Sequence, residues 1–163
     1  MSTRIAVLIT DEFEDSEFTS PAEVYKRAGY EVVTIEEQAG KTVKGKQGDA
    51  EVTIDRSIDD VSPAEFDALL LPVAPLPAFP TDLQYPTSVA GVAQPDYLGW
   101  MRTATYLTVT GHPVISMPAG FSSAGTPLGV QIVGRHRAER ALLSIAKGFE
   151  NVTGFAARRP ALG

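Results

Sequence analysis

The chain contains no cysteine. Disulfides, thiolate nucleophiles, cysteine-ligated zinc and iron–sulfur clusters are therefore excluded. Long apolar runs are also missing, because none approaches the ~20 residues that a transmembrane helix needs. The N-terminal stretch MSTRIAVLITDEFED has too short an apolar segment and too many early acidic residues for a signal peptide. We therefore expect a cytoplasmic protein that does not enter a membrane.

The 163 residues, 44% of them apolar, suffice for one domain with a full core. Basic residues are scarce in the first part of this chain. Residues 1–72 hold seven Lys and Arg against sixteen Asp and Glu, whereas residues 73–163 hold seven against four. This shift at one point indicates two different ancestries. The acidic part disfavours nucleic acid, and the later basic residues are too dispersed for a phosphate-binding stripe.

The hydropathy pattern predicts an α/β alternation in residues 1–72. Apolar runs at 4–10, 30–37 and 68–71 are typical of buried strands, the first and third belonging to a parallel sheet. Apolar residues at helical spacing lie between the first two runs and end at Gly29. Two helix starts remain open: a capping box that begins at Ser20, or a helix from about residue 14 that is bent at Pro21.

After the strand at 68–71, four prolines in the sequence LPVAPLPAFP end the sheet pairing, because proline cannot donate to a ladder. Residues 73–95 show no regular pattern, and we expect them to be the least ordered internal stretch. A helix is predicted over 97–110 with Asp96 as N-cap. Strands at 114–118 and 128–134 form a hairpin, and a clear amphipathic helix follows over 138–152. A further hairpin over 41–58 is expected on a sheet edge.

These elements predict one single domain over residues 1–163. The fold class is three-layer α/β/α, with a mixed, mainly parallel sheet that is flavodoxin-like in its N-terminal half. The five long strands form one sheet, mixed because the last two are joined by a hairpin. The helix, the hairpin and the last helix make up the C-terminal half over 96–163, behind a proline-rich connection at 73–95.

Several motifs suggest chemistry without the setting that the chemistry needs. Gly40-Lys41-Thr42 has the end of a phosphate-binding loop, but Ile35 stands where its first glycine belongs. Ser122 and Ser123 lie in a hairpin loop, not in the strand-to-helix turn of a nucleophile elbow. His112 and His136 have no obvious carboxylate partner, so we expect no metal site. The acidic run at 11–17 follows a parallel strand, where α/β folds place active sites, although it also suits a helix N-terminus.

Two stretches of the chain resemble known families. Residues 1–72 resemble the N-terminal part of the DJ-1/PfpI superfamily, of the bacterial general stress protein type, through RIAVLITDEFEDSEFTSPAEVYKRAGYEVVTIE, GKTVKGKQGDAEVTID and SPAEFDALLLP. Residues 73–163 resemble the C-terminal portion of amidase-signature hydrolases, most clearly in TGHPVISMPAGF and PLGVQIVGR. The segment LLLP suits a strand of either family. The resemblance therefore implies a chimera spliced within a shared strand.

What the resemblance implies for chemistry is mainly loss. In the first family an acidic residue of the first helix, Glu17 here by motif, contacts a cysteine on an A-x-C-H-G elbow, and this elbow is absent. In the second family the catalytic lysine and serines precede the retained portion. We therefore expect a chimeric scaffold, engineered or recombined, that tests fragment recombination and has no catalytic activity, with Glu17 vestigial and no cofactor or metal.

Two alternatives remain open. The first is a weak residual hydrolase or glyoxalase-like enzyme around Glu17, in which a general base alone gives slight rates. The second is an interaction module that uses apolar surface exposed by the deleted parental segments. We expect no defined small-molecule substrate, no nucleic-acid partner and no membrane contact, and homo-oligomerisation stays open.

Overall fold

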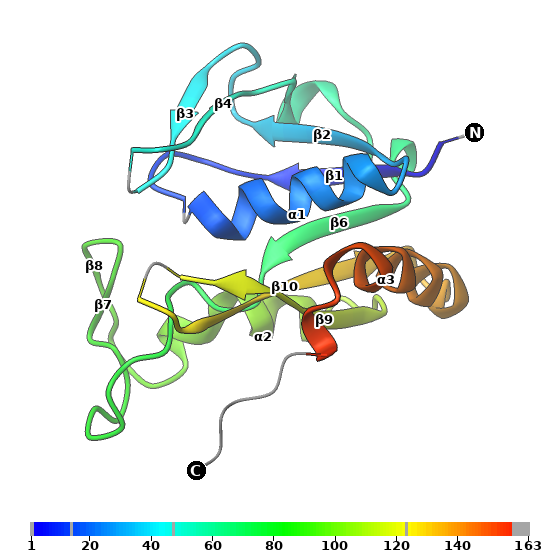
Figure 1. Ribbon diagram of the computed structural model, residues 1–163. Coiled ribbons are helices and arrows are strands. Elements are labelled where there is room, and N and C mark those ends of the chain that lie inside the picture. Colours follow the sequence, from blue (N-terminus) through cyan, green and yellow to red (C-terminus); the bar gives the residue numbers. More distant parts are fainter. Residues whose placement is uncertain (1, 14, 47, 123, 158–163) are drawn as a thin grey trace.

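The computed structural model describes residues 2–13, 15–46, 48–122 and 124–157. Its centre is a six-stranded sheet in the order β5-β2-β1-β6-β10-β9 (Figure 1). The strands are β1 (Arg4–Leu8), β2 (Glu31–Glu36), β5 (Arg56–Ser57), β6 (Ala68–Pro72), β9 (Val114–Phe121) and β10 (Pro127–Gly134). Strands β5, β2, β1 and β6 run parallel to one another, whereas β10 runs antiparallel to β6 and to β9. The predicted single sheet, mixed and mainly parallel, is confirmed.

Strand β6 lies between the two parts of the chain. On one edge it pairs in parallel with β1, where Ile5 faces Ala68. On the other edge it pairs antiparallel with β10, where Ile132 faces Leu70. Pro72 ends β6, and the next residue, Val73, donates its N–H to Gly129 O at 3.2 Å. The strand at which the two resemblances meet is therefore hydrogen-bonded to both parts of the chain.

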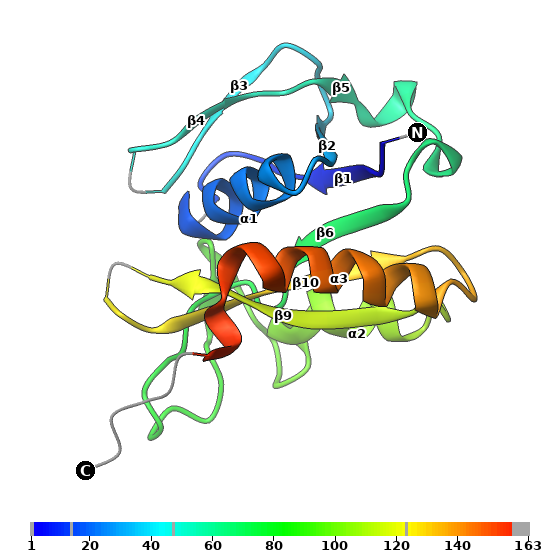
Figure 2. The ribbon, with the colours of Figure 1, turned by 45° about the vertical axis from the view of Figure 1, so that its right-hand side comes forward.

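Helices cover both faces of the sheet. Helices α1 (Asp15–Arg27) and α3 (Glu139–Thr153) pack side by side on one face, and α2 (Arg102–Thr108) lies on the other (Figure 2). The core between the sheet and the first two helices contains residues from both parts, and Tyr25 of α1 and Phe149 of α3 are fully buried in it. A smaller cluster around Ala6, Val33 and Phe66 occupies the second face.

The structure decides where each predicted helix begins and ends. Helix α1 begins at Asp15 and continues through Pro21, so the alternative start at the Ser20 capping box is wrong. Helix α3 agrees with the prediction and ends at Gly154 in the left-handed conformation (φ 60°). The helix predicted over 97–110 is shorter, because a 3-10 turn η3 (Gly99–Met101) precedes α2. The predicted N-cap Asp96 is wrong: the N-caps are Leu98 for η3 and Met101 for α2, although the Asp96 carboxylate accepts hydrogen bonds from the N–H groups of Leu98 and Gly99.

The remaining short elements lie outside the large sheet. The hairpin predicted over 41–58 exists as β3 (Thr42–Lys44) and β4 (Glu51–Thr53), but it forms a separate two-stranded sheet and only β5 joins the edge of the large one. Residues 73–95 contain a small hairpin, β7 (Ser88–Val89) and β8 (Val92–Ala93), which the sequence did not predict. Three more 3-10 turns are η1 (Ile58–Asp60), η2 (Pro63–Glu65) and η4 (Phe155–Ala157). Among the described residues, no helix combines the length and the apolar character that a membrane crossing requires.

Candidate functional site

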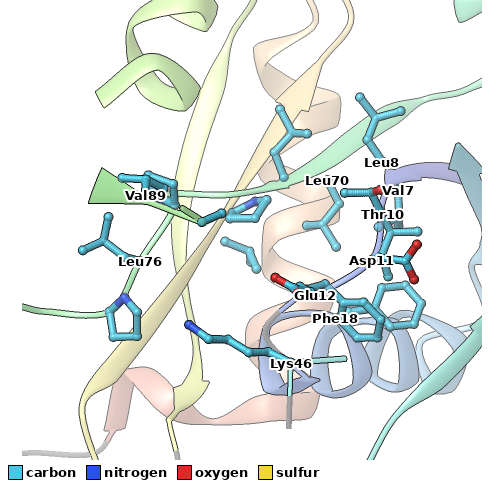
Figure 3. A pocket seen from close by; sticks show the side chains of 18 of the residues that line it. Val7, Leu8, Thr10, Asp11, Glu12, Phe18, Lys46, Leu70, Leu76 and Val89 are labelled. Atoms are coloured by element: carbon cyan, nitrogen blue, oxygen red, sulfur yellow. The ribbon is translucent and has the colours of Figure 1, made fainter. Parts of the chain in front are cut away.

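A cavity of about 450 Å³ opens at the carboxyl ends of β1 and β6 (Figure 3). Ligand sites of parallel sheets lie at this edge. One wall comes from the first part of the chain, where β1, the loop at 10–13 and α1 contribute side chains. The facing wall comes from the second part, through residues 75–77, 88–90 and Val130. Both parts of the chain therefore contribute to the cavity.

The loop that follows β1 is held in a strained conformation at Glu12. Its φ is 62°, a left-handed value that is uncommon for a residue with a side chain. Backbone hydrogen bonds on both sides hold this conformation: Glu12 N–H donates to Lys44 O at 2.8 Å, and Lys46 N–H donates to Phe13 O at 2.8 Å. Strain of this kind persists where surrounding contacts fix it, and it is often found at functional sites.

The acidic run contributes an ion-pair network beside the cavity. Lys41 Nζ lies 3.2 Å from an Asp11 carboxylate oxygen and 2.9 Å from a Glu36 carboxylate oxygen. A backbone hydrogen bond from Lys44, followed by Lys41, lowers the pKa of Asp11, and the hydrogen bond from Lys41 lowers the pKa of Glu36. The same two carboxylates raise the pKa of Lys41. All three groups therefore stay charged at neutral pH and neutralise one another in part.

Two further charges lie at the cavity opening. The exposed side chains of Glu12 and Lys46 extend toward Leu76 and Val89 on the facing wall, whereas Asp11 points the other way (Figure 3). Neither the Glu12 carboxylate nor the Lys46 ammonium forms an ion pair within the described part of the chain. The sequence marked residues 11–17 as an acidic run, but the approach of Lys46 depends on the loop after β3, which no local pattern reveals.

Three candidates named from the sequence, Glu17, Ser122 and Gly40, lie on different elements of the structure. Glu17 lies in α1, but its side chain is outside the described ones. Ser122 lies at the end of the β9–β10 hairpin, as predicted, where its hydroxyl is 2.6 Å from the Thr126 hydroxyl. Gly40 has a left-handed φ of 78° in the turn before β3, so the Gly40-Lys41-Thr42 segment is a turn and not the start of a helix.

The two histidines, far apart in sequence, are neighbours in the structure. Their ring centroids lie 5.9 Å apart, and His136 Nδ1 is 3.2 Å from Gly111 O. They approach because β10 returns antiparallel to β9, a pairing that sequence distance conceals. No cluster of three or more metal-binding side chains occurs among residues 2–13, 15–46, 48–122 and 124–157.

His112 borders a second groove of about 460 Å³ on the α2 face of the sheet. Its floor and walls are apolar and include Ala6, Ile35 and Leu107, with Leu8 and Ile58 at 39% and 47% exposure. Helix α2 covers the sheet beside this groove but does not extend over β1 and β2.

Sequence comparison finds relatives of the first part of the chain. The DJ-1/PfpI family matches residues 3–72. Over 72 residues, 44% of this chain, the sequence is 78% identical to protein/nucleic acid deglycase 2 of Escherichia coli (strain K12) and 61% identical to general stress protein 18 of Bacillus subtilis (strain 168). The chain spans 42% of the length of each of these relatives.

Structure comparison places the whole chain beside a second group of folds. A bacterial aryl acylamidase of the amidase signature family overlays on 98% of this chain with a TM-score of 0.65 and 18% identity, and 46% of that protein is covered. A 6-aminohexanoate cyclic dimer hydrolase overlays on 98% with a TM-score of 0.60 and 20% identity, and 47% of it is covered. The chain thus carries a DJ-1/PfpI segment over residues 3–72 within an amidase-like α/β fold, consistent with a chimera of two parts.

Proposed function

We propose that this chain is an engineered or recombined chimeric scaffold and that it catalyses neither the reaction of DJ-1/PfpI enzymes nor that of amidases. The observation that supports this proposal most directly is the composition of the cavity at the carboxyl ends of β1 and β6. Its lining includes no cysteine and no histidine. Covalent catalysis needs a nucleophile within hydrogen-bond reach of a base, and losing the nucleophile commonly removes on the order of 10⁶ in rate.

One hydroxyl in the lining does contact a carboxylate. Thr10 Oγ1 donates to Glu36 Oε1 at 3.3 Å. The same carboxylate is paired with Lys41, which lowers its pKa. A carboxylate whose pKa lies below its ordinary value is a weak base at neutral pH, so it cannot activate a threonine hydroxyl efficiently.

The path of the chain after β6 supports the same proposal. A nucleophile elbow requires a sharp turn from a strand into a helix. Here the backbone continues from Pro72 to Val73 in contact with β10, and the next α-helix along the chain, α2, begins only at Arg102. The edge of the sheet where an elbow would present its side chain is occupied by residues 75–77.

The test is steady-state turnover of the full chain with methylglyoxal, a peptide and an aryl amide. We expect rates equal to the buffer blank for all three substrates. The variants Glu17→Gln and Ser122→Ala separate the two parental chemistries, and Glu23→Gln on the exposed side of α1 is the matched control. A rate that survives purification and is lost in Glu17→Gln or Ser122→Ala, but not in Glu23→Gln, would overturn the proposal in favour of a residual enzyme.

A second candidate is self-association through the groove on the α2 face. It is favoured by the apolar side chains that remain exposed in this groove, with Leu8 at 39% exposure and Ile58 at 47%. Soluble monomers rarely expose contiguous apolar surface of this kind. Sedimentation velocity over a hundredfold range of concentration tests it: a mass that rises with concentration and is reversed by Ile58→Asp, but not by Leu143→Asp on α3, supports this function. A constant monomer mass excludes it.

A further inference from the structure

We propose that the cavity at the carboxyl ends of β1 and β6 binds a small apolar zwitterion, namely a free α-amino acid with a large apolar side chain. The tail lies in the cavity, the ammonium group contacts Glu12, and the carboxylate contacts Lys46. The inference concerns binding alone and does not depend on whether the chain is an enzyme.

The size and lining of the cavity suit such a tail. Its volume of about 450 Å³ falls in the range of ligand pockets, roughly 300–1,000 Å³. Most of the lining side chains are apolar, and they include Phe18 and Leu70 on one wall and Leu76 and Val89 on the other. Burying a side chain of the size of leucine or phenylalanine among them removes apolar surface from water, which is the main favourable contribution.

The two charges at the opening define the head group. Asp11 also borders the cavity, but its carboxylate is paired with Lys41. This leaves Glu12 and Lys46 as the charged groups that extend into the opening without an ion pair among the described residues (Figure 3). A monoanion would be attracted by Lys46 and repelled by Glu12, whereas a monocation would be attracted by Glu12 and repelled by Lys46. A zwitterion offers each of them an opposite charge.

Glu12 is held in position before a ligand arrives. Its left-handed backbone directs the side chain to the cavity, and the hydrogen bonds to Lys44 O and Phe13 O join the loop after β1, which carries Glu12, to the segment after β3, which carries Lys46. The Phe13–Gly45 bridge adds a third link between this loop and the end of β3. A preformed site costs less ordering entropy on binding than a mobile one.

The experiment compares three ligands by isothermal titration calorimetry at low salt. L-phenylalanine carries both charges, N-acetyl-L-phenylalanine carries only the carboxylate, and L-phenylalaninamide carries only the ammonium group. We expect L-phenylalanine to bind about two- to fivefold more tightly than either analogue, because partly exposed ion pairs contribute up to about 1 kcal/mol. Equal affinity for all three, or no binding of any, would refute the proposal.

Variants assign each charge to its partner. Glu12→Gln should remove the advantage over the N-acetyl compound and keep the advantage over the amide, and Lys46→Gln should do the reverse. Glu23→Gln and Lys26→Gln, at exposed positions on α1, are the matched controls and should change neither. If both cavity variants leave the selectivity intact, the charges do not contact the ligand and the proposal fails.

A third variant tests the cavity itself. Val89→Trp fills the space between the two walls, and it should weaken binding of L-phenylalanine at least about tenfold, the factor that corresponds to about two buried methylenes lost. An unchanged thermal midpoint shows that this variant is folded; if the midpoint falls, Leu76→Trp replaces it. Chemical-shift changes on the Leu70 and Val89 methyl groups, seen on adding ligand to the unmodified chain, locate the site independently. Shifts confined to other regions would place the ligand elsewhere.

Discussion

Replacing Phe149 by alanine should unfold both parts of the chain together. Phe149 lies on α3, in the second part of the chain, and is fully buried. Its ring centroid is 5.1 Å from that of Tyr25 on α1, in the DJ-1/PfpI segment. The same core cluster includes Ile5 of β1 and Ile132 of β10. Because the ring touches both parts, its loss removes packing from each.

The expected loss is large compared with the total stability. Truncating a buried phenylalanine to alanine costs about 3–5 kcal/mol, whereas a domain is stable by about 5–15 kcal/mol. Leu143 is the matched control on the same helix, because its side chain is 58% exposed. Leu143→Ala should cost less than about 1 kcal/mol, since most of the side chain already contacts water.

Urea unfolding with two probes measures the effect. The fluorescence of Trp100, the single tryptophan, reports on the second part, and amide exchange of the β1 residues reports on the first. If the parts share one core, both probes give the same midpoint in the unmodified chain, and both midpoints fall together in Phe149→Ala. Two separate midpoints, or a fall confined to the Trp100 signal, would refute the idea of a common core.

Three further changes and one measurement test other features of the structure. The buried Tyr25 hydroxyl, whose pKa burial raises, has no hydrogen-bond partner among the described residues, so Tyr25→Phe should raise the free energy of unfolding by about 1 kcal/mol. Arg135 Nε donates to Phe66 O at 2.8 Å across the two parts, and Arg135→Met should lower the free energy of unfolding by about 1 kcal/mol in urea titrations. The hydrogen bond from Lys41 lowers the pKa of Glu36 in the folded chain, so the Glu36 carboxylate stabilises the fold at pH values above its ordinary pKa of 4.5. This contribution is lost as the pH falls through the lower pKa of the folded state, and Glu36→Gln should therefore make the free energy of unfolding depend less on pH in that acidic range. Hydrogen exchange should find residues 81–95 the least protected internal stretch, and strong protection throughout would contradict this.

The main strands of the large sheet could be predicted because each is a short apolar run that is buried when it pairs within the sheet. The sequence placed β1, β2, β6, β9 and β10 in one mixed sheet, and the structure confirms this. Helix α3 was equally clear, since its apolar stripe is regular and Gly154 stops it. These features depend on local periodicity, which a sequence displays directly.

The parts that the sequence did not predict depend on tertiary contacts. Pro21 removes one backbone donor from α1, yet the helix passes through it, because Val24 and Tyr25 beyond it are buried in the core. Propensity is overridden by packing at this point. Two other features likewise depend on segments that are distant in sequence. The rings of His112 and His136 are neighbours because β10 returns beside β9, and the segment that carries Lys46 is hydrogen-bonded to the loop that carries Glu12. Residue types alone do not indicate either arrangement.

Two parts with different resemblances can share one sheet because a strand presents two independent edges. The backbone of β6 satisfies its donors and acceptors through β1 on one side and β10 on the other, and hydrogen bonds between backbones do not depend on ancestry. What does depend on sequence is the fit of side chains above the sheet, and there Leu70 of β6 packs with Val7 of β1 and Val130 of β10 in one cluster. Aliphatic side chains of similar size tolerate exchange far better than polar ones, since cores accept hydrophobic substitution when volume is kept. If the chain is the chimera proposed above, a segment from one family occupies the place of its counterpart in another fold. A catalytic site, which requires particular polar groups from several segments at fixed distances, would not be retained by such an exchange.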